Sequence, residues 1–334
     1  MIEKKIQSFY RNRKCTLLGV GPMSKNCVDA TVELANHHEV PIFLIASRRQ
    51  IDSTQLGGGY VNNWTTKEFS EYVNGRAIIQ RDHGGPSQGN INDDGLESFR
   101  CDAKYFDLIH IDPWKHYTNF LDGFEETLYL IKFLYWKNPN LRFEIGTEEA
   151  IRRFSVNELN NLLYNLENKL SSDIFNSIEY VVVQSGVGLN LGKQINTGQF
   201  DPKRLEKMIN VCKRFGKKTK EHNGDYLSVK EYADRFDLGL DSINIAPQFG
   251  QFETSCYLDE MNNDIQDFYQ ICYESKRWEK WVDKDFEPEK NKKELIRICG
   301  HYVLSDQKFI DIKPNIDDKI NYKLKAELNR IINA

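Results

Sequence analysis

Short apolar runs alternate along this chain with longer segments that have helical periodicity. The pattern predicts eight strands, near residues 14–20, 40–46, 77–81, 106–111, 141–145, 178–184, 217–221 and 242–246. Segments of helical period lie between successive strands, for example at 24–38, 118–136 and 201–215. Strands separated by helices favour a parallel sheet, since each parallel crossover needs a long connection. Eight such units in roughly 250 residues predict an α/β fold, a (β/α)8 TIM barrel.

The seventh predicted strand differs from the others because it is polar, reading Lys-Lys-Thr-Lys-Glu over 217–221. Its assignment rests on its position in the repeating pattern. A doubly wound sheet is disfavoured, since no Gly-x-Gly-x-x-Gly follows the first strand. Beyond residue 250 the chain is helical and charged, and no Gly/Ser-rich or Pro-rich linker precedes it. We therefore expect a barrel over 1–250 and a helical C-terminal extension over 251–334, packed on the barrel.

Composition narrows the classes of function. The 334 residues carry 45 Lys and Arg against 49 Asp and Glu, a net charge of -4, which argues against a nucleic-acid partner. No apolar run approaches the roughly 18 residues of a membrane span, and the N-terminus lacks the apolar core of a secretory signal. We expect no membrane association and a cytoplasmic location. The seven cysteines form no Cys-x-x-Cys pair, so a cysteine-based zinc site is disfavoured.

Polar side chains gather where the predicted strands end. In a barrel of this type the reactive groups lie at the C-terminal ends of the strands and in the loops that follow. The third strand ends in Asp82-His83, the fourth in His110-Ile111-Asp112, and the fifth in Glu144 with Glu148 and Glu149 just beyond. The seventh runs into His222-Asn223 and the eighth includes Asn244. These carboxylates and imidazoles should therefore converge on one mouth of the barrel.

Two histidines and a carboxylate from different strands can form an open divalent-metal site. We predict His83, Glu144 and His222 as the ligands and Zn²⁺ as the metal. Such a site could hold the oxygens of a ketose while a neighbouring carboxylate moves a proton, which is aldol or epimerase chemistry. Asp82, next to a ligating histidine, is the predicted proton carrier, and Glu148 and Glu149 are the next candidates.

Eight further residues are candidates for substrate binding: Arg48, Arg49, Gln50, Gly58, Gly59, Asp112, Asn223 and Asn244. Arginine binds phosphate through two parallel hydrogen bonds, and glycines let backbone N–H groups approach it. Other interpretations stay open for these positions. The two arginines could be ordinary surface charges, Asp112 could only cap a turn, and Glu148 and Glu149 could be first-turn helix carboxylates. His83 and His222 could be core histidines, and His301 is expected at the surface.

Taken in order, these strand ends resemble the class II, zinc-dependent ketose-bisphosphate aldolase superfamily. They are more closely similar to the tagatose-bisphosphate aldolase subunit family traditionally called non-catalytic. The matching segments are Ala46 to Gln50 with Gly58-Gly59-Tyr60, Asp82 to Pro86, Ile109 to Asp112, Ile145 to Glu148, His222 with Asp225-Tyr226, and Leu304-Ser305-Asp306.

This resemblance implies a proton-transfer role for Asp82 and zinc ligation by His83, Glu144 and His222. It also implies that Glu148 or Glu149 belongs to a mobile acidic loop. The chain departs from the superfamily at strand six, where a further zinc histidine is expected and only Gln184, Ser185 or Asn190 is present. The glycine-rich phosphate loop of the superfamily is likewise reduced to Asn223-Gly224-Asp225.

The expected function is that of a metal-dependent enzyme acting on a ketose or ketose phosphate. It would be either an aldolase-type lyase or a ketose(-phosphate) 4-epimerase, using retro-aldol or enediolate chemistry. Two alternatives stay open: a non-catalytic partner that stabilises a class II aldolase subunit, and a sugar-binding barrel without a metal. A small sugar or sugar phosphate is the expected ligand, and a homo-oligomer or a partner aldolase subunit is the expected protein partner.

Overall fold

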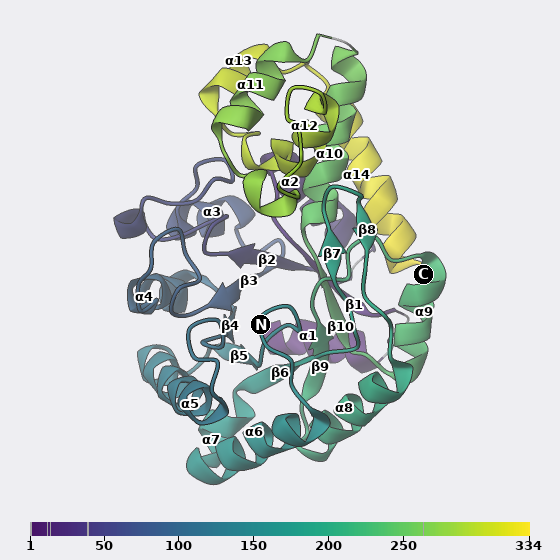
Figure 1. The fold of residues 1–334 in the computed structure, drawn as a ribbon. Helices are drawn as coiled ribbons and strands as arrows, with labels where there is room; N and C mark the ends of the chain where they lie inside the picture. The colour runs from purple at the N-terminus through teal and green to yellow at the C-terminus, as the bar shows by residue number, and fades with distance from the viewer. Residues whose placement is uncertain (1, 12, 14, 39, 263) are drawn as a thin grey trace.

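Eight parallel strands close into a barrel at the centre of the computed structural model, which describes residues 2–11, 13, 15–38, 40–262 and 264–334 (Figure 1). The barrel order is β1-β10-β9-β6-β5-β4-β3-β2. The strands are β1 (Leu17–Val20), β2 (Phe43–Ser47), β3 (Ile78–Gly84), β4 (Leu108–Ile111), β5 (Arg142–Ile145), β6 (Ile178–Val183), β9 (Lys218–Glu221) and β10 (Ser242–Ile245). All eight predicted strands are present, and the predicted (β/α)8 barrel is confirmed. Residue 14 of the first predicted range lies outside the described residues.

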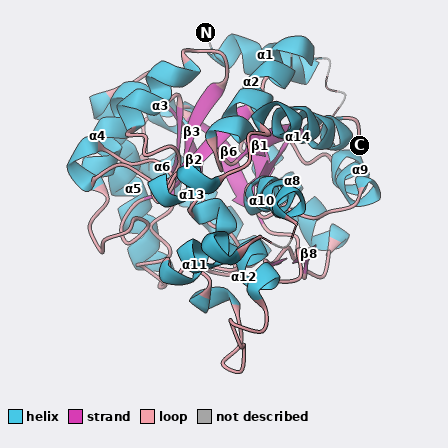
Figure 2. Ribbon diagram, turned by 90° about the horizontal axis from the view of Figure 1, so that it is seen from above, coloured by secondary structure: helices cyan, strands magenta, loops and turns pink. Residues whose placement is uncertain are grey.

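Helices surround the barrel and follow its strands in turn (Figure 2). Three of them begin with a capping box, in which Thr65, Ser155 or Ser228 pairs with a glutamate three residues later. The surrounding helices are α2 (Lys25–His38), α3 (Thr66–Val73), α4 (Leu96–Tyr105), α5 (Phe120–Lys137), α6 (Val156–Lys169), α7 (Ser172–Asn176), α8 (Pro202–Arg214) and α9 (Val229–Leu238), with a short 3-10 turn, η1 (Thr54–Leu56).

The polar seventh strand, β9, is stabilised by partners for each of its side chains in and around the barrel. Lys220 is fully buried and pairs with Glu144 of β5, with 2.8 Å between Nζ and Oε2. Glu221 pairs with Arg235 of α9 at 2.6 Å. The hydroxyl of Thr219 donates to Asp241. Because each buried polar group has a partner, the strand tolerates a composition that its neighbours lack.

Two elements were not predicted from the sequence. Helix α1 (Ile2–Arg11) lies at the N-terminal end of the barrel, where Ile6 packs in one cluster with residues that begin several strands, among them Leu17, Phe43 and Leu108. The hydroxyl of Tyr10 donates to the carbonyl oxygen of Asp241 at 3.0 Å. The second element is a hairpin of β7 (Leu189–Asn190) and β8 (Ile195–Asn196) in the loop after β6.

The C-terminal extension is helical, as expected, and packs against the barrel. Helices α10 to α13 lie together above the barrel in Figure 1, and α14 runs back along α10 and contacts α2. The elements are α10 (Pro247–Met261), α11 (Gln266–Glu274), η2 (Glu279–Trp281), α12 (Lys292–Cys299), η3 (Gly300–Tyr302), α13 (Gln307–Ile312) and α14 (Asp317–Ile332). Within the described residues, no helix combines the length and the apolarity that a bilayer crossing requires.

Candidate functional site

An irregularity at the end of β3 turns two consecutive side chains toward the same place. The pairing register between β3 and β4 shifts between Arg81 and Gly84, and His83 has a φ of 45°. Successive side chains of a regular strand point to opposite faces, whereas a bulge with a left-handed residue re-aims one of them. Asp82 and His83 therefore both reach the mouth of the barrel. Gly84 is required next, since a Cβ there would lie 2.5 Å from Phe99.

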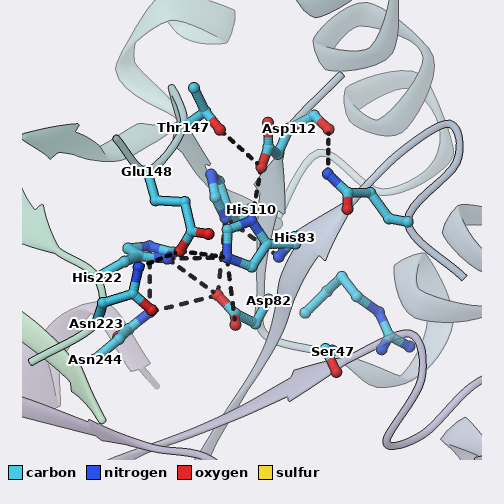
Figure 3. Close-up of polar contacts among 12 residues, drawn as sticks. Ser47, Asp82, His83, His110, Asp112, Thr147, Glu148, His222, Asn223 and Asn244 are labelled. Atoms are coloured by element: carbon cyan, nitrogen blue, oxygen red, sulfur yellow. Dashed lines mark hydrogen bonds and ion pairs between the residues drawn. The ribbon is translucent and has the colours of Figure 1, made fainter. Parts of the chain in front are cut away.

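His83 and His222 face each other across this mouth (Figure 3). Their closest ring nitrogens, Nε2 of His83 and Nδ1 of His222, are 3.2 Å apart. The other nitrogen of each ring is held by a carboxylate: Nδ1 of His83 lies 2.6 Å from Asp112, and Nε2 of His222 lies 2.6 Å from Glu144. A carboxylate acceptor fixes the N–H on its own side of the ring. In the tautomers that place each N–H toward its carboxylate, the two facing nitrogens are both free to bind a cation.

A third histidine, His110 of β4, completes the cluster. Its Nε2 lies 3.0 Å from the carbonyl oxygen of Gly146, and its Nδ1 accepts a hydrogen bond from the backbone N–H of His83. Ligand atoms of Asp82, His83, His110 and His222 all lie within 4.8 Å of one another. The sequence placed His110 at a strand end but did not assign it a ligand role. Its position one strand after the Asp-His pair was the available signal.

Glu144 lies beside this cluster rather than inside it. One of its oxygens accepts from His222, while the other is 2.6 Å from Nε2 of Gln80 and 2.8 Å from Nζ of Lys220. Lys220 and the imidazoles hold the pKa of Glu144 well below its usual value, against the effect of burial. The structure thus brings together His83 and His222 of the predicted ligand set, adds His110 and Asp82, and uses Glu144 to orient His222.

The charges around the cluster favour a cation at its centre. Burial opposes protonation of His83, yet Asp82, Asp112 and Glu148 raise the pKa of this imidazole well above its ordinary value. Burial would raise the pKa of Asp82, and the three histidines hold it below its usual value instead. Carboxylates outnumber the single buried ammonium of Lys220 here. A donor set of imidazole nitrogens and a carboxylate with excess negative charge fits a divalent cation.

The candidate proton-transfer residues lie at different places. Asp82 is 3.6 Å from Nδ1 of His222 and accepts from Nδ2 of Asn244. Glu148 is 3.6 Å from Nε2 of His83 and accepts a 2.6 Å hydrogen bond from Asn223. Glu149 points elsewhere, because it pairs with Arg153 and Arg204 at the side of the barrel. Of the three, only Asp82 and Glu148 adjoin the histidines.

The candidate substrate-binding residues also separate into two groups. Arg49, Gln50 and Asn223 line a cavity above the histidines, and Asn244 contacts both Asp82 and His222. The remaining four make contacts within the protein. Arg48 is buried and pairs with Asp52 and Asp93. Asp112 holds His83, and Gly58 and Gly59 pack closely against loop backbone.

Strand six supplies no group to the cluster. The side chain of Gln184 forms hydrogen bonds with backbone groups of Thr147, Arg152 and Phe154. Ser185 donates to Glu221, and Asn190 accepts from the backbone of Lys193 in the hairpin. The third imidazole therefore comes from β4, through His110, and not from any of these three positions.

The cavity above the histidines has a volume of about 760 Å³, with a floor from the barrel and an opposite wall from the C-terminal extension. Asp82, His83, Glu148 and Asn223 form its floor with loops of the barrel. The opposite wall comes from the C-terminal extension, through segments 275–281 and 301–302. The volume is in the range of pockets that hold small organic ligands.

Comparison with known proteins identifies the fold. No protein-family model and no curated protein matches this sequence. A solved structure of a probable tagatose 6 phosphate kinase from Sinorhizobium meliloti is similar, with a TM-score of 0.71 and 14% identity, over 95% of this chain and 99% of that one. The YdjI aldolase from Escherichia coli matches with a TM-score of 0.59, 10% identity and coverage of 99% and 96%. A fructose-bisphosphate aldolase from Campylobacter jejuni matches with a TM-score of 0.58, 12% identity and coverage of 99% and 94%. The expected resemblance is thus confirmed in the fold, which is a (β/α)8 barrel shared with these aldolase structures.

Proposed function

We propose that this chain is a divalent-metal-dependent enzyme that acts on a ketose or ketose phosphate by retro-aldol or epimerase chemistry. One observation carries the proposal: the ring nitrogens of His83 and His222 that face each other are 3.2 Å apart, beside Asp82 and under a cavity of substrate size. Two imidazole nitrogens at this separation can bind one cation when both rings are neutral and donate their other N–H to Asp112 and Glu144. Its place at the C-terminal mouth of the barrel is where enzymes of this architecture have their active sites.

The spacing suits zinc. Two nitrogens bound at about 2.1 Å to a tetrahedral ion lie about 3.4 Å apart, close to the separation of the two ring nitrogens here. The carboxylates of Asp112 and Glu144 behind the rings orient them, as outer-shell carboxylates do in zinc sites. His110 and Asp82 are the further groups within reach. Both nitrogens of His110 are engaged by backbone groups, so His83 and His222 would hold the ion, with Asp82 and His110 beside it.

The residues around the cluster have distinct proposed roles. A bound divalent cation would supply a Lewis acid for the carbonyl and hydroxyl oxygens of a sugar. Asp82 would take the proton of the substrate hydroxyl as the carbon–carbon bond breaks and its electron pair moves toward the carbonyl. Glu148, held by Asn223, is placed to return a proton on the His83 side. The extension forms one wall of the cavity and would limit the access of water to this chemistry.

Aldolase and epimerase reactions share this first half. After cleavage, an aldolase releases the aldehyde fragment, whereas a 4-epimerase lets it rotate and closes the bond on the other face. Retention of the fragment depends on how fully the cavity is covered. The wall from the C-terminal extension therefore bears on which of the two reactions occurs, and both belong to the proposed function.

The test is turnover of a panel of ketohexoses, their 6-phosphates and bisphosphates by the full-length protein, followed by NMR with and without added Zn²⁺. We expect conversion of at least one ketose that stops with a chelator and returns with Zn²⁺. A zinc-loaded protein that converts none of them, but raises the activity or stability of a separate class II aldolase subunit, would replace this proposal with the non-catalytic alternative.

A further inference from the structure

Basic side chains collect on the wall of the cavity away from the carboxylates of its floor. The C-terminal extension contributes Arg277 and Lys280, and the loops after β2 and β4 contribute Arg49 and Lys115. Lys276 and Glu279 lie on the same wall and are exposed, as are Lys115 and Lys280. Cations thus outnumber carboxylates on this side, whereas Asp82 and Glu148 lie beside the histidines. The cavity has an acidic, histidine-rich floor and a basic upper wall.

These four cations keep most of their hydrogen-bonding capacity. Within the described residues none of them has a carboxylate within ion-pair distance: Arg49 donates to the carbonyl of Gly89, and Lys115 to that of Ser87. Arg277 lies over the ring of Tyr60 at 5.3 Å, and Lys280 over that of Trp281 at 4.4 Å. Other arginines near the barrel are paired: Arg48, Arg81 and Arg235 all have carboxylate partners.

The cations are close enough to disfavour one another's charge. Partial desolvation, and then the charges of Arg49, Arg277 and Lys115, lower the pKa of Lys280 to about 8 although its side chain is exposed. Burial and Arg49 likewise lower the pKa of Lys115. Like charges held together without a counter-ion cost free energy. An anion placed among them would remove this cost, so the arrangement points to a negatively charged ligand.

A buried polar group on the same wall has no partner. His301 was expected at the surface, but it is 1% exposed, because η3 packs against α10 and α12. Neither of its ring nitrogens has a hydrogen-bond partner, and the residue lines the cavity. A buried polar group without a partner costs free energy. Both ring nitrogens are covered, so the residue shapes this wall without exposing a donor to the cavity.

We propose that Arg49, Lys115, Arg277 and Lys280 form a binding site for the anionic group of the substrate, a phosphate ester or a carboxylate. The inference rests on the proposed function for the other end of the substrate. The sugar carbonyl would lie at the histidines and the anionic end against the C-terminal extension. This site takes the place of the glycine-rich phosphate loop, which the chain reduces to Asn223-Gly224-Asp225. The enzyme would accordingly prefer an acidic or phosphorylated ketose to a neutral one.

Binding of unreactive polyols tests the site without relying on turnover. Calorimetry on the full-length protein would compare glucitol 6-phosphate, gluconate and neutral glucitol, none of which has the carbonyl that aldol cleavage needs. The variants are Arg277→Gln, Lys280→Gln and Arg49→Gln. A matched control is the double variant Lys284→Gln/Lys293→Gln, which removes two exposed charges of the same extension outside the cavity lining. Circular dichroism would check that each variant is folded.

We expect the wild-type protein to bind at least one of the two anionic polyols at least tenfold more tightly than glucitol. Loss of one charge-assisted contact should weaken anion binding about 10- to 100-fold and leave glucitol binding unchanged. The control variant should bind all three polyols as the wild-type protein does. Preference for the phosphate identifies a sugar phosphate as substrate, and preference for gluconate identifies a sugar acid. Equal binding of all three polyols, or unchanged anion binding in all three variants, overturns the proposal. Failure of the proposed function would instead appear as absent turnover with anion binding intact.

Discussion

Lys220 and Glu144 form an ion pair inside the barrel, with Nζ 2.8 Å from Oε2 and both side chains fully buried. The second oxygen of Glu144 holds His222 at 2.6 Å. The pair therefore links the polar strand β9 to the orientation of a histidine in the candidate site. Burying a charge inside a barrel is costly. Here the buried pair of Lys220 and Glu144 positions His222 of the candidate site.

The first prediction is that Lys220→Met strongly destabilises the fold. It leaves the Glu144 carboxylate buried without its cation, and breaking a buried pair costs about 3–5 kcal/mol. Chemical denaturation measures the change. Lys230→Met is the control, because its pair with Asp234 is exposed and exposed pairs contribute about 1 kcal/mol or less. The double variant Lys220→Met/Glu144→Gln should recover much of the loss. Equal effects of Lys220→Met and Lys230→Met would contradict this account.

The second prediction concerns Asp82, which lies 3.6 Å from Nδ1 of His222. If Asp82 moves the proton, Asp82→Asn should lower turnover of the ketose substrate by about two to four orders of magnitude. Bound metal should stay near the wild-type content, as measured by mass spectrometry of the element. Glu149→Gln, at the side of the barrel, should keep turnover within about twofold. Loss of metal in Asp82→Asn would make Asp82 a ligand and leave Glu148 as the proton carrier.

The third prediction is a pH dependence of stability that arises from Glu253 of α10. Burial raises the pKa of this carboxyl from 4.5 to about 7, although Ser24 and Asn26 donate hydrogen bonds to it. Between these two values the folded state binds the proton more tightly than the unfolded state does. The free energy of unfolding should therefore fall as the pH rises, by up to about 3 kcal/mol from this group.

Denaturation at pH 5 and pH 8 measures this effect. Burial also raises the pKa of Asp225 to about 7, and this group changes the stability in the same direction. The contribution of Glu253 is therefore isolated by comparing the wild-type protein with Glu253→Gln. The variant should lose less stability across the interval than the wild-type protein does. Glu260→Gln, at an exposed carboxyl paired with Lys319, should behave like the wild-type protein. Parallel pH profiles for wild type and Glu253→Gln would exclude Glu253 as the source.

The barrel could be predicted from the sequence because its cause is local. Each βα unit shows a short apolar run followed by a helical period, and every predicted strand is present. Helix α1 was missed because its contacts, with residues such as Phe43 and Tyr180, lie far away in sequence. The polarity of β9 could be explained only in three dimensions, since the partner of Lys220 comes from β5.

The candidate site was predictable as a region but not in its details. Strand ends must converge in a barrel, so the sequence placed His83, His222 and the carboxylates together. The sequence does not show which way a side chain points. Glu148 and Glu149 are neighbours, yet one faces His83 and the other pairs with Arg204. Arg48 and Arg49 separate in the same way, since the first is buried against Asp52 and Asp93 and the second lines the cavity.

The central claim is that the histidine cluster holds a divalent cation. Its most direct test is the metal content of full-length protein purified without chelator, measured by elemental mass spectrometry for wild type, His83→Ala, His222→Ala and the surface control His37→Ala. The account predicts about one equivalent of divalent metal, zinc foremost, in the wild-type protein and the control, and loss of it in both cluster variants. A folded wild-type protein that neither contains metal nor takes up added Zn²⁺ would contradict it.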